Sequence, residues 1–277
     1  MSFPKNSRGR RLDRLICFQP ARWPHAERIS RVTALLIISG FLVFRLWQFD
    51  RFPQTWPAAQ RFYGLFLTPG GAPVYPAALI ALLWGVKLAA WLIETGIFAG
   101  YIAAYVSRAP ARAPACGIME TAFPVLVAGL PVLMAMAPYT LPHWAPPASP
   151  RHLIFYLTAM ALMLLGGLIN LIGLISLRRA FTIMTEARVL ITHGIFRHVR
   201  HPLYTGHFVM FLGTLLLRWH FVTVLLYLLF LIGQFKRAQL EERKLAVVFP
   251  EYRDYRKRTG MFWPFRRRPV GRGVRRM

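Results

Sequence analysis

The stretch "LYTGHFVMFLGTLLLRWHFVTVLLYLLFLIGQFK", residues 203–236, is the most informative part of the chain for predicting its fold. It contains two apolar runs, 203–217 and 221–236, joined only by residues 218–220. Each run has about 15 residues, which is short for an independent crossing of a hydrocarbon core about 30 Å thick. Because so short a connection makes the runs antiparallel neighbours, we predict a tight helical hairpin whose ends return to the same side of a membrane.

The rest of the chain extends this pattern. Four more apolar stretches precede the hairpin, at 32–48, 76–106, 121–141 and 152–177. The sequence of 277 residues is 56% hydrophobic and 16% charged, a composition typical of membrane proteins. We therefore predict an all-α polytopic membrane protein with about six transmembrane helices. The run 76–106 is too long for one perpendicular crossing, so we expect it to tilt or to project from the membrane.

The basic residues predict the orientation. The chain has 35 Lys and Arg against 10 Asp and Glu, a net charge of +25. With the N-terminus inside, 29 of the 35 fall in cytoplasmic segments and only 4 in outer loops, so we expect both termini in the cytoplasm. The short outer loops favour a bacterial inner membrane. No nucleic-acid-binding module accompanies the charge, so we expect the basic termini to contact anionic headgroups and not nucleic acid.

Two cytoplasmic stretches, 178–207 and 234–264, carry most of the remaining polar residues. The predicted hairpin connects them, so their ends must lie close together. Arg237 and Glu241 are spaced to share one helix face, and taken alone they fit a surface salt bridge between interfacial anchors. His198 and His201 could begin a metal site, but no third ligand has a suitable spacing, so we expect no metal.

Two further features have a structural interpretation. Cys17 and Cys116 are far apart in segments that we place in the cytoplasm, so we expect no disulfide. Gly166 and Gly167 lie inside an apolar run with no strand before them, so we expect helix packing and not a phosphate loop.

An ordered set of motifs changes the interpretation of the polar stretches. The segment "GIFRHVRHPLYTG", residues 194–206, is followed after the hairpin by "EERKLAVVF", residues 241–249, and by "YRDY", residues 252–255. This set resembles the isoprenylcysteine carboxyl methyltransferase family, part of a wider group that includes phospholipid N-methyltransferases. The resemblance covers about the last 90 residues, whereas the first four apolar stretches match only as generic membrane helices.

The resemblance implies a cytoplasmic pocket for S-adenosylmethionine and a lipophilic, membrane-borne acceptor. Its cofactor-binding positions would be Val189, Leu190, Ile191, Phe196, His201, Pro202, Leu203, Tyr204 and Glu241. Arg237 would face the acceptor. Two positions depart from the family pattern, since Phe196 stands where Tyr is frequent and Pro250 replaces a Gly.

The chemistry of these side chains agrees with such roles. The Glu241 carboxylate suits the cofactor's ammonium, His201 suits its carboxylate, and the rings of Phe196 and Tyr204 suit its adenine or sulfonium. An acceptor carboxylate is already ionised and needs only a cation such as Arg237 to hold it. An acceptor amine must lose a proton first, which makes His201 or Glu242 the candidate base.

The prediction is therefore an integral-membrane methyltransferase, with a carboxylate acceptor favoured over a lipid amine. A membrane protein that only binds or transports a small molecule is the alternative from another class. We divide the chain into a basic cytoplasmic segment (1–31), a four-span region that sets acceptor specificity (32–177), a methyltransferase core (178–264) and a basic disordered tail (265–277). Lys87 and Glu94, seven residues apart in the second span, are a candidate polar element of the acceptor route.

Overall fold

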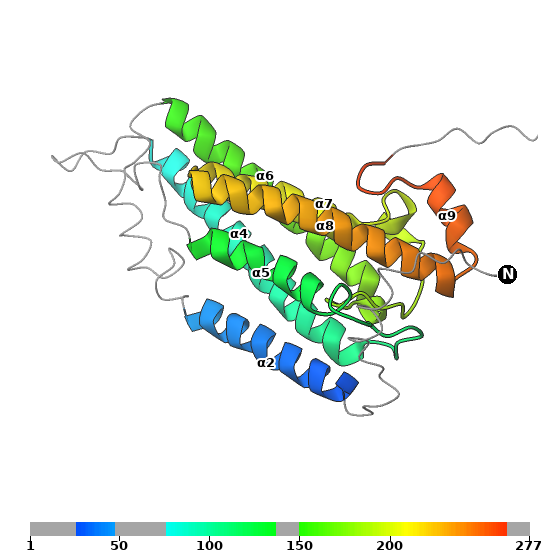
Figure 1. Ribbon diagram of the computed structural model, residues 1–277. Coiled ribbons are helices and arrows are strands. Elements are labelled where there is room, and N and C mark those ends of the chain that lie inside the picture. The colour runs from blue at the N-terminus through cyan, green and yellow to red at the C-terminus, as the bar shows by residue number, and fades with distance from the viewer. Residues whose placement is uncertain (1–25, 48–75, 137–149, 265–277) are drawn as a thin grey trace, which may run out of the picture.

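The computed structural model describes residues 26–47, 76–136 and 150–264, and its regular elements there are all helices (Figure 1). They are α2 (Ala26–Trp47), α4 (Ala77–Ser107), α5 (Ala122–Met136), α6 (Pro150–Leu177), α7 (Pro202–Leu217), α8 (Phe221–Val248), α9 (Tyr252–Arg258) and two short 3-10 turns, η3 (Arg178–Ala180) and η4 (Gly194–Arg197). The prediction of an all-α protein is confirmed for this part of the chain. The tail 265–277 and most of the segment 1–31 lie outside the described residues.

Three helical segments are long and apolar enough to cross a membrane, namely Ala77–Ser107, Leu153–Ala180 and Phe221–Val248. Three shorter apolar segments, Arg31–Val43, Ala122–Met134 and Pro202–Leu217, accompany them. Large hydrophobic side chains such as Leu126, Ile154 and Phe221 are exposed on the outside of the helices, as contact with lipid requires. An integral membrane protein follows from these helices, while the number of six crossings stays a prediction.

Helices α6 and α7 pack with their backbones almost in contact. A Cβ on Gly206 would lie 2.7 Å from the carbonyl oxygen of Gly166, and one on Gly213 would lie 2.5 Å from that of Ala159. Gly167 faces α4 in the same way, where a Cβ would meet Ile93 at 2.7 Å. Small residues are what permit such close crossings in membranes. The expectation that Gly166 and Gly167 serve helix packing is confirmed.

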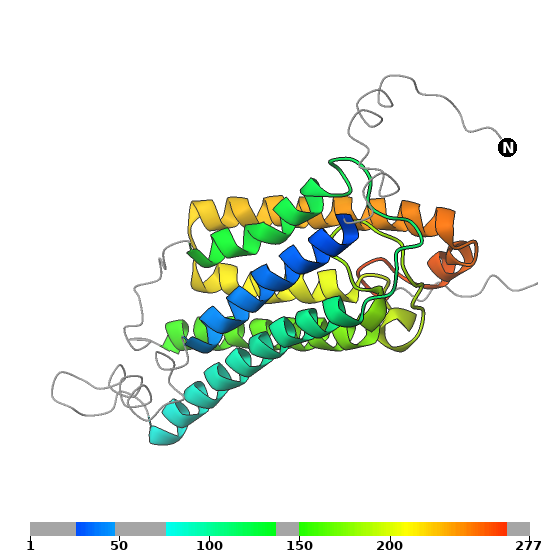
Figure 2. The same ribbon diagram turned by 90° about the horizontal axis from the view of Figure 1, so that it is seen from below.

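Helices α7 and α8 form the predicted hairpin (Figures 1 and 2). The backbone N–H of Arg218 closes α7, and the His220 side chain caps α8 by accepting from the N–H of Val222 at 3.2 Å. Helix α8 continues past the predicted span 221–236, as the placing of Arg237 and Glu241 on one helix face anticipated, because residues 237–248 are strong helix formers and run on to Val248. The polar residues of this extension therefore stand on a rigid helix.

Helix α9 folds back against the end of α8 (Figure 1). Its buried residues Tyr252 and Tyr255 pack with Phe249 and Ala187, so an apolar cluster holds the short helix in place. Its basic residues remain exposed.

The expectation of no disulfide is wrong in this structure, because Cys116 is disulfide-bonded. The other cysteine of the chain, Cys17, lies outside the described residues. The distance between two cysteines along the sequence does not predict whether the fold brings them together.

Candidate active site

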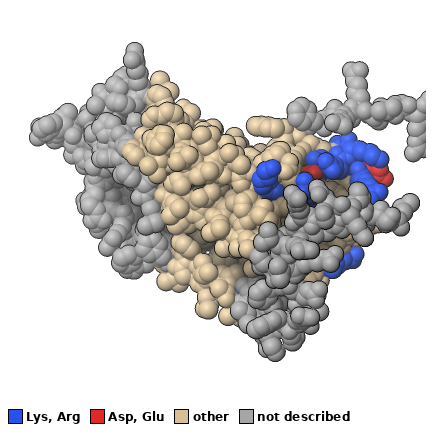
Figure 3. Space-filling model, in the orientation of Figure 1, with Lys and Arg blue, Asp and Glu red and all other residues tan. Residues whose placement is uncertain are grey.

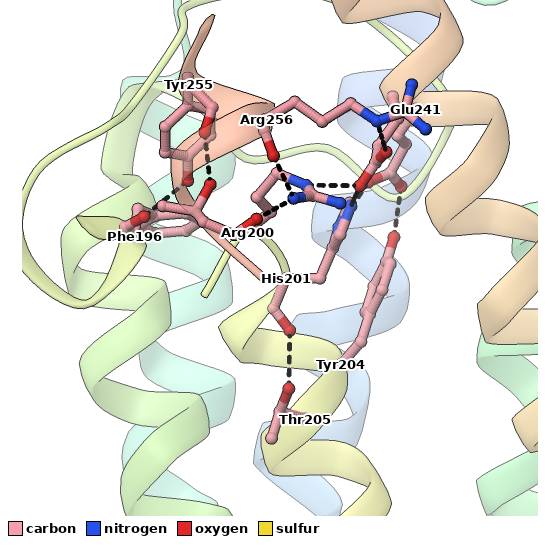
Figure 4. Close-up of polar contacts among 10 residues, drawn as sticks. Phe196, Arg200, His201, Tyr204, Thr205, Glu241, Tyr255 and Arg256 are labelled. Atoms are coloured by element: carbon pink, nitrogen blue, oxygen red, sulfur yellow. Dashed lines mark hydrogen bonds and ion pairs between the residues drawn. The ribbon is translucent and has the colours of Figure 1, made fainter. Parts of the chain in front are cut away.

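The polar residues singled out by the motifs meet where α7 begins, beside the middle of the α8 extension (Figure 4). His201 precedes α7, and its Nε2 lies 3.3 Å from Oε1 of Glu242. Its Nδ1 lies 3.7 Å from Oε2 of Glu241. One turn on, the Tyr204 hydroxyl donates to Glu241, and the Tyr204 ring stacks on the His201 ring at a centroid distance of 5.3 Å. The hairpin thus joins two motifs that are about 40 residues apart in the sequence.

Arg237 lies one turn further into the bundle and is buried, with 5% of its surface exposed. Its Nη1 donates to Oε1 of Gln234 at 3.1 Å, and its Nη2 donates to the carbonyl oxygen of Ile183 at 2.8 Å. The guanidinium carbon lies 5.2 Å from the centre of the Tyr204 ring. Nη2 of Arg237 lies 3.9 Å from Oε1 of Glu241, whose side chain is 22% exposed. Because the Arg237 side chain is buried, the interpretation of this pair as a salt bridge between two surface side chains is wrong. Nε of Arg237 is buried and finds no hydrogen-bond partner among the described residues.

Glu242 is held from three sides. Its Oε1 accepts from Nε of Arg200 at 2.8 Å as well as facing His201, and its Oε2 lies 3.4 Å from Nε of Arg256. Arg200 also donates to the backbone carbonyls of Arg256 and Thr259. Sequence reasoning included Arg200 in the motif but gave it no role, because an arginine at a membrane interface is indistinguishable by sequence from a headgroup anchor.

The segment 194–201 is fixed by α9 and by the residues that follow it. Gly194 has a φ of +60°, a conformation that favours glycine and explains why this segment begins with one. The Tyr255 hydroxyl donates to the carbonyl of Phe196 at 2.6 Å, and the N–H of His201 donates to the carbonyl of Met261 at 3.0 Å. Burial raises the pKa of Tyr255 to about 12, against the opposing effect of nearby positive charge, so this donor keeps its proton at neutral pH.

The structure brings only some of the predicted cofactor positions together. His201, Tyr204 and Glu241 converge, and Ile191, Phe196 and Leu203 belong to the same core cluster as Tyr204. Pro202 is buried at the first position of α7, where its missing N–H costs nothing. Leu190 instead packs on the cluster beneath α9, and Val189 is 40% exposed. The cofactor-binding roles of all nine positions stay predictions, and Leu190 and Val189 lie apart from the residues that converge.

A second polar cluster lies near the site. Lys244 on α8 donates to the carbonyls of Pro114 and Thr185 at 2.8 and 2.9 Å and pairs with Glu120. It thereby ties two loops to the α8 extension, a role that no sequence motif indicated. Lys and Arg side chains gather at this end of the molecule in Figure 3, whereas the described bundle beside it shows almost no charged side chains in this view. No group of three or more metal-ligating side chains occurs in the described ranges.

Comparisons with known proteins agree with the motifs. The model of the phospholipid methyltransferase family matches residues 154–251. Protein-S-isoprenylcysteine O-methyltransferase of Schizosaccharomyces pombe is 31% identical over 113 residues, which cover 38% of this chain. The match spans 48% of that enzyme, so the chain covers about half the length of the curated relative.

A solved structure is also similar. The eukaryotic intramembrane Ras methyltransferase, isoprenylcysteine carboxyl methyltransferase, matches with a TM-score of 0.41 and 17% identity. The alignment covers 86% of this chain and 96% of that one. Together with the family match, the curated relative confirms the resemblance drawn from the motifs of residues 194–255.

Proposed function

We propose that the protein is an integral-membrane methyltransferase that uses S-adenosylmethionine and acts on a lipophilic acceptor, with a carboxyl group as the favoured site of methylation. One observation carries this proposal: within the segment that matches a methyltransferase family, His201, Tyr204 and Glu241 surround one point and the buried Arg237 lies one turn deeper. A charged cluster at the membrane interface is where a soluble cofactor and a membrane-borne acceptor can meet.

The chemistry of the cluster fits the cofactor. The Glu241 side chain is 22% exposed, so its carboxylate can accept from the ammonium of an incoming ligand while the hydrogen bond from Tyr204 holds it in place. The Tyr204 ring offers a face for a cation, as it already does for Arg237. When bound, S-adenosylmethionine supplies a methyl group on a cationic sulfur. The protein's part is to align the accepting atom with that methyl group and to exclude water.

Arg237 supports a carboxylate acceptor. A guanidinium holds a carboxylate through two parallel N–H donors, and the unpartnered buried Nε of Arg237 leaves one such donor available. The carboxylate is ionised at neutral pH, so its oxygen needs no general base. The competing acceptor, a lipid amine, needs a group that takes its proton. Glu242 is poorly placed for that task because Arg200 and His201 already occupy Oε1.

The orientation and compartment are part of the proposal. Both termini and the cofactor pocket face the cytoplasm, the membrane is a bacterial inner membrane, and the spans within 32–177 select the acceptor. Cys116 is disulfide-bonded in the structure but lies at the end of the bundle that this orientation assigns to the cytoplasm, where disulfides are reduced, so the proposed orientation requires a reduced Cys116 in the cell. Thiol labelling of Cys116 in intact cells tests the assignment: labelling only by membrane-permeant reagents supports it, and labelling by impermeant reagents after mild reduction contradicts it.

The decisive experiment is calorimetric titration of S-adenosylmethionine into the purified protein in detergent. Wild type should bind, whereas Glu241→Ala and His201→Ala should lose binding. Glu251→Ala, at an exposed residue that makes no capping hydrogen bond at the start of α9, is the matched control and should bind like wild type. Binding would be followed by transfer of a radiolabelled methyl group into membrane extracts. A folded wild type that binds no cofactor refutes the proposal.

A further inference from the structure

A partly buried polar pair, Tyr101 on α4 and His207 on α7, lies deeper in the bundle than the cluster just described. The Tyr101 hydroxyl and Nε2 of His207 are 3.2 Å apart. Neither residue belongs to the motifs shared with the family as the sequence presents them. The pair links two helices that each pack against α6, so it spans the interior of the bundle.

The pair leaves one ring nitrogen of His207 without a partner. Nδ1 is buried, and no hydrogen bond to it exists among the described residues. If the tyrosine donates to Nε2, Nδ1 carries the proton and lacks an acceptor; with the other tautomer it lacks a donor. An unpaired polar atom is costly in an apolar interior, where water is scarce. A bound ligand with a hydroxyl or carbonyl group would remove that cost.

The position of His207 suits the chain of a bound acceptor. His207 follows Tyr204 by three residues on α7, a rise of about 4.5 Å along the helix axis. Its ring stacks on Phe211 at 5.7 Å and meets the edge of Phe230 at 6.5 Å, so its surroundings are aromatic and apolar. Because Arg237 faces the Tyr204 ring one turn earlier on α7, a carboxylate held by Arg237 would bring the first part of the acceptor chain near His207.

We infer that Tyr101 and His207 form a polar subsite for the acceptor chain. The inference rests on the function proposed above and narrows its substrate class: the acceptor is a lipophilic carboxylate that carries a hydroxyl or equivalent hydrogen-bonding group near its carboxyl group. The rise of about 4.5 Å from Tyr204, whose ring faces Arg237, to His207 corresponds to a separation of roughly four carbon–carbon bonds. A hydroxyl both donates and accepts, so it satisfies Nδ1 in either tautomer.

The test uses two probes that differ by one oxygen, 5-hydroxyoctadecanoic acid and octadecanoic acid, with radiolabelled S-adenosylmethionine and the full chain in nanodiscs. Wild type should methylate the hydroxylated probe with a kcat/KM about tenfold higher. His207→Phe, which keeps a ring beside Phe211, and Tyr101→Phe, which removes only the hydroxyl, should bring this ratio close to one. Both variants should keep the cofactor affinity of wild type.

Tyr227→Phe is the matched control, because it removes another buried hydroxyl from the hairpin, the one that donates to the carbonyl of Phe208 at 2.9 Å. It should leave the ratio unchanged. The subsite is refuted if wild type methylates both probes with the same kcat/KM, or if it binds the cofactor and methylates neither probe. It is also refuted if the His207 and Tyr101 variants both lower kcat/KM equally for the two probes, because a pair that only links two helices would have that effect. Absence of cofactor binding by wild type would instead refute the proposed function itself.

Discussion

Replacing Glu242 with Gln should loosen α9 and the segment 194–201 without unfolding the bundle. The substitution keeps the size of the side chain and removes its charge. The Glu242 and Arg200 side chains are only 6% and 9% exposed, and their atoms are 2.8 Å apart. Removing one partner of such a buried pair costs about 3–5 kcal/mol, since the other charge stays buried. Arg200 keeps two carbonyl acceptors, which places the cost at the lower end.

A cost of about 3 kcal/mol corresponds to a change of roughly 100-fold in the equilibrium between the docked and undocked segments. Arg256 adds little to this figure, because its side chain is 61% exposed and solvent screens its contact with Glu242. Hydrogen exchange in nanodiscs measures the change directly. Amides of residues 194–201 and 252–258 should exchange roughly 100-fold faster in Glu242→Gln, while amides in α6 should keep their protection.

The control is Asp254→Asn, which breaks an exposed pair with Lys257 on α9 and should leave exchange unchanged. A double-mutant cycle sharpens the test. If the ion pair dominates, Arg200→Met combined with Glu242→Gln should cost clearly less than the sum of the two single variants. Additive costs, or equal exchange in Glu242→Gln and Asp254→Asn, would refute the assignment of Glu242 as the residue that docks this segment.

Three further outcomes are expected. Tyr204→Phe removes the hydrogen bond to Glu241 and should weaken S-adenosylmethionine binding about tenfold by calorimetry, since a hydrogen bond to a charged group contributes about 1.5–3 kcal/mol; unchanged affinity would contradict the site. Gly206→Ala forces a Cβ against backbone atoms of α6 and should sharply lower the thermal midpoint, whereas Gly85→Ala, with nothing within 4 Å of the added atom, should not. Because the pKa of Tyr255 in the folded protein is raised to about 12, the contribution of Tyr255 to stability should be complete below pH 10 and lost as the pH rises through 12. In a spectrophotometric titration, Tyr255→Phe should lose one tyrosine that titrates near pH 12 in wild type. Identical titrations of wild type and Tyr255→Phe near pH 12 would contradict this.

Much of the architecture could be predicted from local sequence. The apolar runs predicted the helices, and the three-residue connection 218–220 predicted the hairpin, because chain connectivity alone forces neighbours so joined to be antiparallel. The motifs at 194–206 and 241–255 predicted the family. The spacing of Arg237 and Glu241 predicted that the helix continues beyond the apolar run 221–236, but the fall in hydropathy gave no end point, and Val248 as its last residue came from the structure.

The tertiary structure alone decided what each polar side chain contacts. The spacing of Arg237 and Glu241 fitted a surface salt bridge equally well, and only the packing of loop 181–188 and Tyr204 over Arg237 buried it. The link of His207 to Tyr101 joins residues 106 positions apart. The sequence of this protein determined which segments are helices and which residues can do chemistry, because period and composition are local properties. Which of those residues meet was decided by the close crossing of α6 and α7 and by the folding back of α9, since such contacts depend on how several helices pack at once.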